Sequence, residues 1–172
     1  MVIKMDKYIR IAGIINESIV DGPGIRMVVF AQGCKHKCPG CHNPETHSFD
    51  GGTLVTVESI LDQARKNPLL DGITFSGGEP FEQAEMFAYL AREAKKYNLN
   101  IMTYTGYTYE YLLENSFRHK GWDELLAETD ILVDGRFEIE KRNLLLKFRG
   151  SENQRMIDVH RTMVENRVVV MD

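Results

Sequence analysis

Cys34-Lys35-His36-Lys37-Cys38-Pro39-Gly40-Cys41 is the most informative stretch of this 172-residue chain. It contains all three cysteines of the sequence in a Cys-x3-Cys-x2-Cys spacing, which places three thiolates on one short loop. Iron–sulfur clusters are held by cysteine thiolates, normally four of them. Three ligands on a four-iron cluster leave one iron free to bind another molecule, much as an open position distinguishes a catalytic zinc from a structural one. The spacing therefore favours a [4Fe-4S] cluster with one open iron.

Two other interpretations of the three cysteines stay open at this point. A structural zinc site would add His36, His42 or His47 as a fourth ligand, although zinc ligands usually come as two short pairs and no second pair follows. Free thiols are the second possibility. A disulfide framework is disfavoured, because the number of cysteines is odd and the N-terminus lacks the apolar stretch of a signal peptide. We therefore expect reduced cysteines and a cytoplasmic protein.

Composition is typical of one globular domain, which we predict to span residues 1–172. Hydrophobic residues make up 43% and charged residues 27% of the chain, and the net charge of −4 gives no basic footprint for nucleic acid. The apolar runs are far shorter than the ~20 residues that cross a bilayer.

The chain outside the cysteine loop alternates short apolar, β-branched runs with segments of helical periodicity. Strands are predicted at 25–31, 72–75, 100–105 and 131–133, with a final pair at 156–159 and 167–171. Helices are predicted at 57–64 with Thr56 as the cap, and at 81–97, 109–115 and 122–128. This alternation is typical of an α/β fold with βαβ units and a mainly parallel sheet.

Four loops follow the predicted parallel strands directly. In such sheets ligands bind at the carboxyl ends of the strands, so we expect these loops to share one rim. They are the cysteine loop, Ser76–Pro80, Thr105-Gly106 and Asp134-Gly135.

The order of these motifs resembles that of the radical S-adenosylmethionine enzymes, and among them the activases of glycyl-radical enzymes. The resemblance covers roughly residues 8–160 and is closest to the activases of anaerobic (class III) ribonucleoside-triphosphate reductases. It is carried by the cysteine loop, Asp21-Gly-Pro-Gly-Ile-Arg26, Cys41-His-Asn43, Ser76-Gly-Gly-Glu-Pro80, Thr105-Gly-Tyr107, Val133-Asp-Gly-Arg-Phe137 and Arg149-Gly-Ser-Glu-Asn-Gln154.

This resemblance implies a partial (β/α) barrel of mainly parallel strands and two cofactors, a [4Fe-4S] cluster and S-adenosyl-L-methionine. Cys34, Cys38 and Cys41 would be the metal ligands and carry the electron transfer. Gly77 and Gly78 would let the backbone approach the second cofactor, because they lack a Cβ. The remaining residues assigned to cofactor binding are Gly40, Cys41, His42, Glu79 as acceptor for the ammonium group, Thr105 and Asp134.

One position departs from the family pattern. Radical S-adenosylmethionine enzymes often place an aromatic residue just before the third cysteine, where this chain has Gly40. Contact with the adenine at this position would then come from the backbone. Tyr104, Tyr107 and Trp122 are interpreted as packing residues, and Arg149–Gln154 as a contact either for adenosine or for a partner.

The implied activity is reductive cleavage of S-adenosylmethionine and formation of a glycyl radical on a partner protein. The expected partner is the large subunit of an anaerobic ribonucleoside-triphosphate reductase, and the expected electron donor is a reduced flavodoxin or ferredoxin. Pyruvate formate-lyase or another glycyl-radical enzyme is the alternative partner. A zinc- or cluster-binding adaptor without enzymatic activity is the alternative of a different class.

Overall fold

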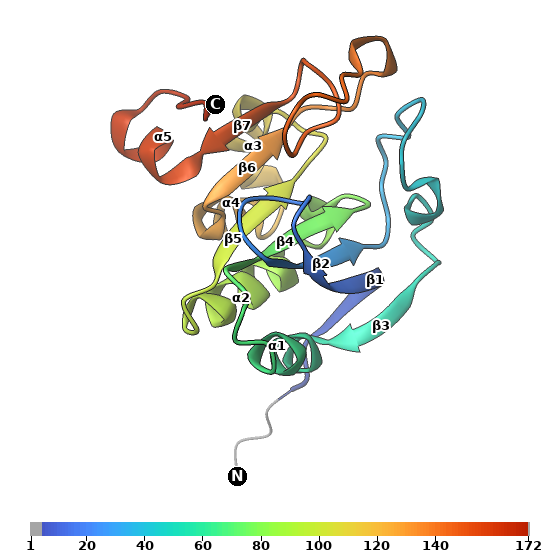
Figure 1. The fold of residues 1–172 in the computed structure, drawn as a ribbon, viewed down its shortest axis with the longest axis vertical. Coiled ribbons are helices and arrows are strands. Elements are labelled where there is room, and N and C mark those ends of the chain that lie inside the picture. The colour runs from blue at the N-terminus through green and yellow to red at the C-terminus, as the bar shows by residue number, and fades with distance from the viewer. Residues whose placement is uncertain (1–4, 172) are drawn as a thin grey trace.

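The computed structural model describes residues 5–171, which form one seven-stranded sheet with five α-helices (Figure 1). Residues 1–4 and 172 lie outside the described residues. They belong to the predicted domain, and residues 1–4 also belong to the N-terminal stretch in which no signal peptide was expected. The centre of the sheet is parallel and is made by β2 (Arg26–Ala31), β4 (Gly72–Gly77), β5 (Asn100–Tyr104) and β6 (Ile131–Asp134). All four strands were predicted, with ends that differ by one or two residues.

Antiparallel strands complete the sheet on both sides. β1 (Tyr8–Ser18) pairs with β2 and with β3 (Thr53–Thr56), and β7 (Arg155–Asp158) pairs with β6. The order β3-β1-β2-β4-β5-β6-β7 leaves the sheet open, with as many antiparallel as parallel pairs. The α/β class is therefore confirmed, while the predicted partial (β/α) barrel is not, and only the centre of the sheet is parallel.

The helices of the central βαβ units form where their apolar periodicity predicted them. Thr56 caps α1 as expected, its side chain accepting from the backbone N–H of Ser59. The predicted helix 81–97 is divided at Gln83, whose φ of −127° is not helical and whose side chain instead bonds both backbone groups of Arg10. The α-helices are α1 (Val57–Arg65), α2 (Ala84–Lys95), α3 (Tyr109–Asn115), α4 (Trp122–Glu128) and α5 (Val159–Glu165). Short 3-10 helices lie at η1 (Pro44–Thr46), η2 (Pro80–Gln83), η3 (Ser116–Arg118) and η4 (Ile139–Lys141).

The two faces of the sheet have different surroundings. Alternate residues such as Met27, Ile73 and Ile101 belong to the main apolar core, which also contains the buried faces of α1, α2 and α4. Their neighbours along the strands, including Phe30 and Ser76, line a cavity instead. Helices therefore pack on one face, and the cavity lies on the other.

A buried arginine holds the β1–β2 turn over the cavity face. Arg26 is 1% exposed, and its guanidinium donates to Thr74 Oγ1 at 2.7 Å and to the carbonyl of Pro23 at 3.1 Å. Burial lowers the pKa of Arg26 to about 10, which still leaves it charged at neutral pH. Thr74 Oγ1 in turn donates to the carbonyl of Asp21 at 2.7 Å. The turn is thereby fixed to β4 by hydrogen bonds at both of its halves.

Candidate functional site

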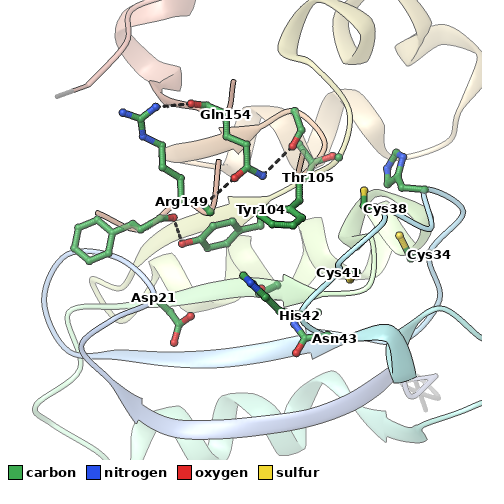
Figure 2. Close-up of a pocket in the computed structure, with 18 of the residues that line it drawn as sticks. Asp21, Cys34, Cys38, Cys41, His42, Asn43, Tyr104, Thr105, Arg149 and Gln154 are labelled. Carbon is green, nitrogen blue, oxygen red and sulfur yellow. Dashed lines mark hydrogen bonds between the residues drawn. The ribbon is translucent and has the colours of Figure 1, made fainter. Parts of the chain in front are cut away.

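The three cysteines line one cavity of about 700 Å³ (Figure 2). Their loop leaves the carboxyl end of β2 and is tied back to the chain that follows it. The backbone N–H of Gly33 donates to the carbonyl of Thr46 at 2.7 Å, and that of Cys34 donates to the carbonyl of His47 at 3.1 Å. Residues from the ends of β4 and β5 line the same cavity, so the shared rim expected from the parallel strands is observed there.

The protein environment favours the neutral thiol at two of the cysteines. Burial raises the pKa of the Cys34 thiol, and this effect outweighs nearby backbone hydrogen bonds that lower the same pKa. Burial also raises the pKa of the Cys38 thiol. Because metal ligands must be deprotonated, binding a cationic metal centre here would release protons.

The three cysteine thiols share one cavity, an arrangement that suits the ligands of a metal cluster. Within residues 5–171, no three or more histidine, cysteine, aspartate or glutamate side chains lie close enough to hold one metal ion. The ligands of a four-iron cluster each bind a different iron, so that three thiolates around a shared space suit it. His47 Nε2, on the same cavity wall, is buried and has no hydrogen-bond partner among the described residues. The cavity wall therefore carries three thiols and one imidazole nitrogen that has no hydrogen-bond partner among the described residues.

Gly77 and Gly78 line the cavity at the end of β4, at positions where side chains are excluded. Gly77 has a φ of +89°, and a Cβ there would lie 2.8 Å from backbone atoms of Ala31. A Cβ on Gly78 would lie 2.5 Å from the carbonyl oxygen of Gly33. Both glycines are thus required for β4 to pack against the start of the cysteine loop, and they leave bare backbone at the cavity.

Glu79 lies behind the cavity wall and does not line it. Its side chain is 1% exposed, and Oε2 lies 2.7 Å from His36 Nε2. The same oxygen accepts from Thr105 Oγ1 at 3.0 Å and from the N–H of Gly106 at 2.9 Å. Oε1 accepts from the N–H of Phe81 at 3.1 Å. Glu79 therefore joins the cysteine loop to the ends of β4 and β5.

The other predicted cofactor-binding residues are divided between the cavity and the surrounding structure. His42 and Thr105 line the cavity, whereas Gly40 does not. Gly40 has a φ of +75° and lies against Ile139, which a Cβ would approach to 2.7 Å.

Asp134 does not line the cavity. Its carboxylate is buried, accepts from the N–H of Tyr109 at 2.8 Å and is paired with Arg155. The neighbouring Gly135 lines the cavity instead. This carboxylate already has a cation and a backbone donor as partners, Arg155 and the N–H of Tyr109, and its role in cofactor binding stays a prediction.

Tyr104 and Gln154 show roles that periodicity did not reveal. Tyr104 lines the cavity, and its hydroxyl donates to the carbonyl of Phe148, as Figure 2 shows. Burial raises the pKa of Tyr104, which keeps that hydroxyl protonated. Gln154 accepts from the N–H of Gly150 at 2.9 Å and donates to the carbonyl of Gly135 at 3.0 Å. Both residues fix the β6–β7 connection beside the cavity, and only their distant partners identify this role.

Within residues 5–171, no helix is both long and apolar enough to span a membrane. The predicted location in the cytoplasm stays a prediction.

Comparisons with known proteins give a consistent result. A family model described as a 4Fe-4S single cluster domain matches residues 20–157. The anaerobic ribonucleoside-triphosphate reductase-activating protein of enterobacteria phage T4 is 33% identical over 145 residues, which cover 80% of this chain and 86% of that protein. A pyruvate formate-lyase-activating enzyme of Clostridium pasteurianum is 37% identical over 130 residues, covering 72% of this chain but only 50% of that protein. Among solved structures, QueE from Escherichia coli aligns with a TM-score of 0.47 at 16% identity, over 59% of this chain and 53% of that chain.

Proposed function

The chain belongs to the 4Fe-4S single cluster domain family, among the radical S-adenosylmethionine activases of glycyl-radical enzymes, and we propose that it activates an anaerobic ribonucleoside-triphosphate reductase. The observation that carries this proposal is the cavity that three cysteines share with two bare glycines at the ends of parallel strands. An enzyme with S-adenosylmethionine as its second ligand suits this arrangement, and the proposed location is the cytoplasm.

Cys34, Cys38 and Cys41 are the residues that would hold a [4Fe-4S] cluster. Such a cluster, once reduced, would supply the electron for reductive cleavage of S-adenosylmethionine and so the means to take a hydrogen atom from a glycine Cα. Cys34 is buried, and the hydrogen bonds of the Gly33 and Cys34 N–H groups hold the start of the loop in place.

The remaining cavity residues would position the second ligand. Gly77 and Gly78 present backbone without a Cβ, and His42 lies at the other side with its ring 5.2 Å from that of Phe137. Glu79 was expected to accept directly from the ammonium group. Because its two oxygens already accept from four donors, we assign it to holding the cysteine loop, and the strand-end backbone to the ammonium.

The extent of the similarity favours the reductase over pyruvate formate-lyase as the partner. The chain covers 86% of the reductase-activating relative but spans only half of the pyruvate formate-lyase-activating one. A zinc-binding adaptor is the alternative of a different class. Metal analysis after anaerobic purification separates the two classes, since a cluster gives about four irons and four sulfides per chain.

A direct test mixes the protein anaerobically with a reductase of the same organism, a reductant and S-adenosylmethionine. We expect a glycyl-radical doublet by electron paramagnetic resonance, with reduced flavodoxin or ferredoxin able to replace the chemical reductant. The matched control is Cys41→Ala, which should give no doublet. A cluster-loaded protein that cleaves S-adenosylmethionine but never produces a doublet on the reductase would refute the assigned partner.

A further inference from the structure

A hairpin between β6 and β7 lies at the mouth of the cavity. Residues 141–152 form a hairpin-like loop whose two arms are joined by an antiparallel bridge between Arg142 and Ser151. The N–H of Asn143 donates to the carbonyl of Gly150 at 3.2 Å. In Figure 1 this connection, in orange, rises beside the cysteine loop at the same edge of the molecule. The hairpin is thus a shaped element of the rim.

Its tip presents leucines to solvent. Leu144 is 81% exposed and Leu145 is 91% exposed, the latter held by a hydrogen bond from its N–H to Asn143 Oδ1 at 2.9 Å. Leu144 and Leu146 also line the cavity that contains the three cysteines. Ordered, adjacent apolar side chains at the mouth of a cavity are typical of a binding surface.

The β1–β2 turn contributes a second apolar segment at the same cavity. The β1–β2 turn exposes Ile19 by 74% and Val20 by 72%, and Val20 lines the same cavity as Leu144. Since the hydrogen bonds of Arg26 and Thr74 fix this turn to β4, both apolar segments are held in place. A segment entering the cavity would meet apolar side chains from both the turn and the hairpin.

Charge narrows the chemistry of the occupant. The hairpin, residues 141–152, carries four basic side chains and one acidic one, Glu152, although the chain has a net charge of −4. The basic residues are Lys141, Arg142, Lys147 and Arg149. Lys141 is partly neutralised by Glu138 at 2.7 Å. An apolar tip with basic flanks complements a protein segment that has apolar residues with acidic neighbours.

We propose that the tip formed by Leu144 and Leu145, together with Ile19 and Val20, docks the glycine-bearing loop of the partner protein and guides it into the cavity. This inference rests on the proposed function, because it assumes that a partner glycine must reach the cavity. It adds the surface that receives the partner and the chemistry of the segment received: extended, apolar and flanked by acidic residues.

The test is partner affinity after Leu145→Asp, with Leu69→Asp as the matched control. Leu69 is 62% exposed, and its N–H donates to an asparagine side chain in the same way, Asn67 Oδ1 at 3.0 Å, but it precedes β4 at the opposite end of the strands. The probe is the anaerobic reductase of the same organism, immobilised for anaerobic biolayer interferometry. We expect Leu145→Asp to raise the dissociation constant for the reductase by about tenfold or more, as loss of an apolar interface anchor does. Leu69→Asp should leave the dissociation constant within about twofold of the wild-type value.

Iron content and affinity for S-adenosylmethionine, measured for both variants, separate lost docking from damage to the cavity. Equal partner affinity of Leu145→Asp and wild type would overturn the docking inference, while a glycyl radical formed by wild type would leave the proposed function intact. Binding of wild type to anionic lipid vesicles, lost in Leu145→Asp without any change in partner affinity, would also overturn it in favour of a membrane surface.

Discussion

Replacing Glu79 by alanine removes one buried carboxylate that accepts four hydrogen bonds. Two of the donors are the side chains of His36 and Thr105, which can rotate toward another acceptor. The other two are the backbone N–H groups of Phe81 and Gly106, which cannot. A buried donor without a partner costs about 1–3 kcal/mol, and Gly106 is only half-buried, so we expect the free energy of unfolding to fall by about 2–4 kcal/mol.

The assay is urea unfolding of the cluster-free, reduced protein, followed by circular dichroism at neutral pH. Glu82→Gln is the matched control on the same turn. Glu82 accepts from the Tyr107 hydroxyl at 3.0 Å and lies 3.4 Å from the exposed Lys35, and a Gln side chain keeps an acceptor for the former, so about 0–1 kcal/mol is expected. If Glu79→Ala changes the unfolding free energy by less than that control, the carboxylate does not hold the loop. A roughly tenfold to hundredfold loss of S-adenosylmethionine affinity would then indicate direct contact with the ammonium.

Three further predictions concern the cavity. Cys34→Ala, Cys38→Ala and Cys41→Ala should each abolish S-adenosylmethionine cleavage, because the chain has no other cysteine, and full cleavage by any one of them after reconstitution would refute the ligand assignment. Gly78→Ala should lower the melting temperature by several degrees, because its Cβ would lie 2.5 Å from a backbone oxygen. Gly13→Ala is the control, since a Cβ there meets nothing within 4 Å. Equal melting temperatures of the two variants would contradict the packing argument. In the cluster-free protein at pH 8, Cys34 should react with iodoacetamide more slowly than glutathione does, because burial raises the pKa of its thiol. Its rate of alkylation, measured by peptide mass spectrometry, should rise with pH. A rate at pH 8 equal to that of glutathione would contradict the raised pKa.

Local patterns predicted the parallel centre of the sheet, whereas its antiparallel edges depend on long-range pairing. The buried runs of β2, β4, β5 and β6 are short, apolar and bounded by turn residues, so each could be identified alone. β1 was not predicted, since its pairing with β2 is interrupted by two register shifts, between Ile11 and Gly13 and between Ile15 and Ser18, and its second half is largely exposed. β3 has four residues, two of them exposed. The final predicted pair is confirmed for β7, but 167–171 contributes only an isolated bridge at Val170, and α5 lies between them.

At the candidate site, the positions of the cysteines and of Gly77 and Gly78 after predicted strands were enough to predict that they lie together. Roles that depend on a distant partner could not be read from the sequence. Asp134 has a carboxylate that could bind a ligand, yet this carboxylate is already paired with Arg155 and accepts a hydrogen bond from a backbone N–H. Glu79 follows two glycines at a strand end, yet its oxygens turn toward His36 and Thr105. The difference in each case is the direction of a side chain at a correctly predicted strand end.

Isotope transfer tests the central claim, that this chain generates a radical which abstracts hydrogen from a partner glycine. The reductase is prepared with its radical glycine deuterated at Cα and mixed anaerobically with the cluster-loaded protein, reductant and unlabelled S-adenosylmethionine. The 5′-deoxyadenosine is then analysed by mass spectrometry. We predict that it carries one deuterium in step with growth of the glycyl doublet. Unlabelled 5′-deoxyadenosine formed while the glycyl radical accumulates would contradict direct abstraction.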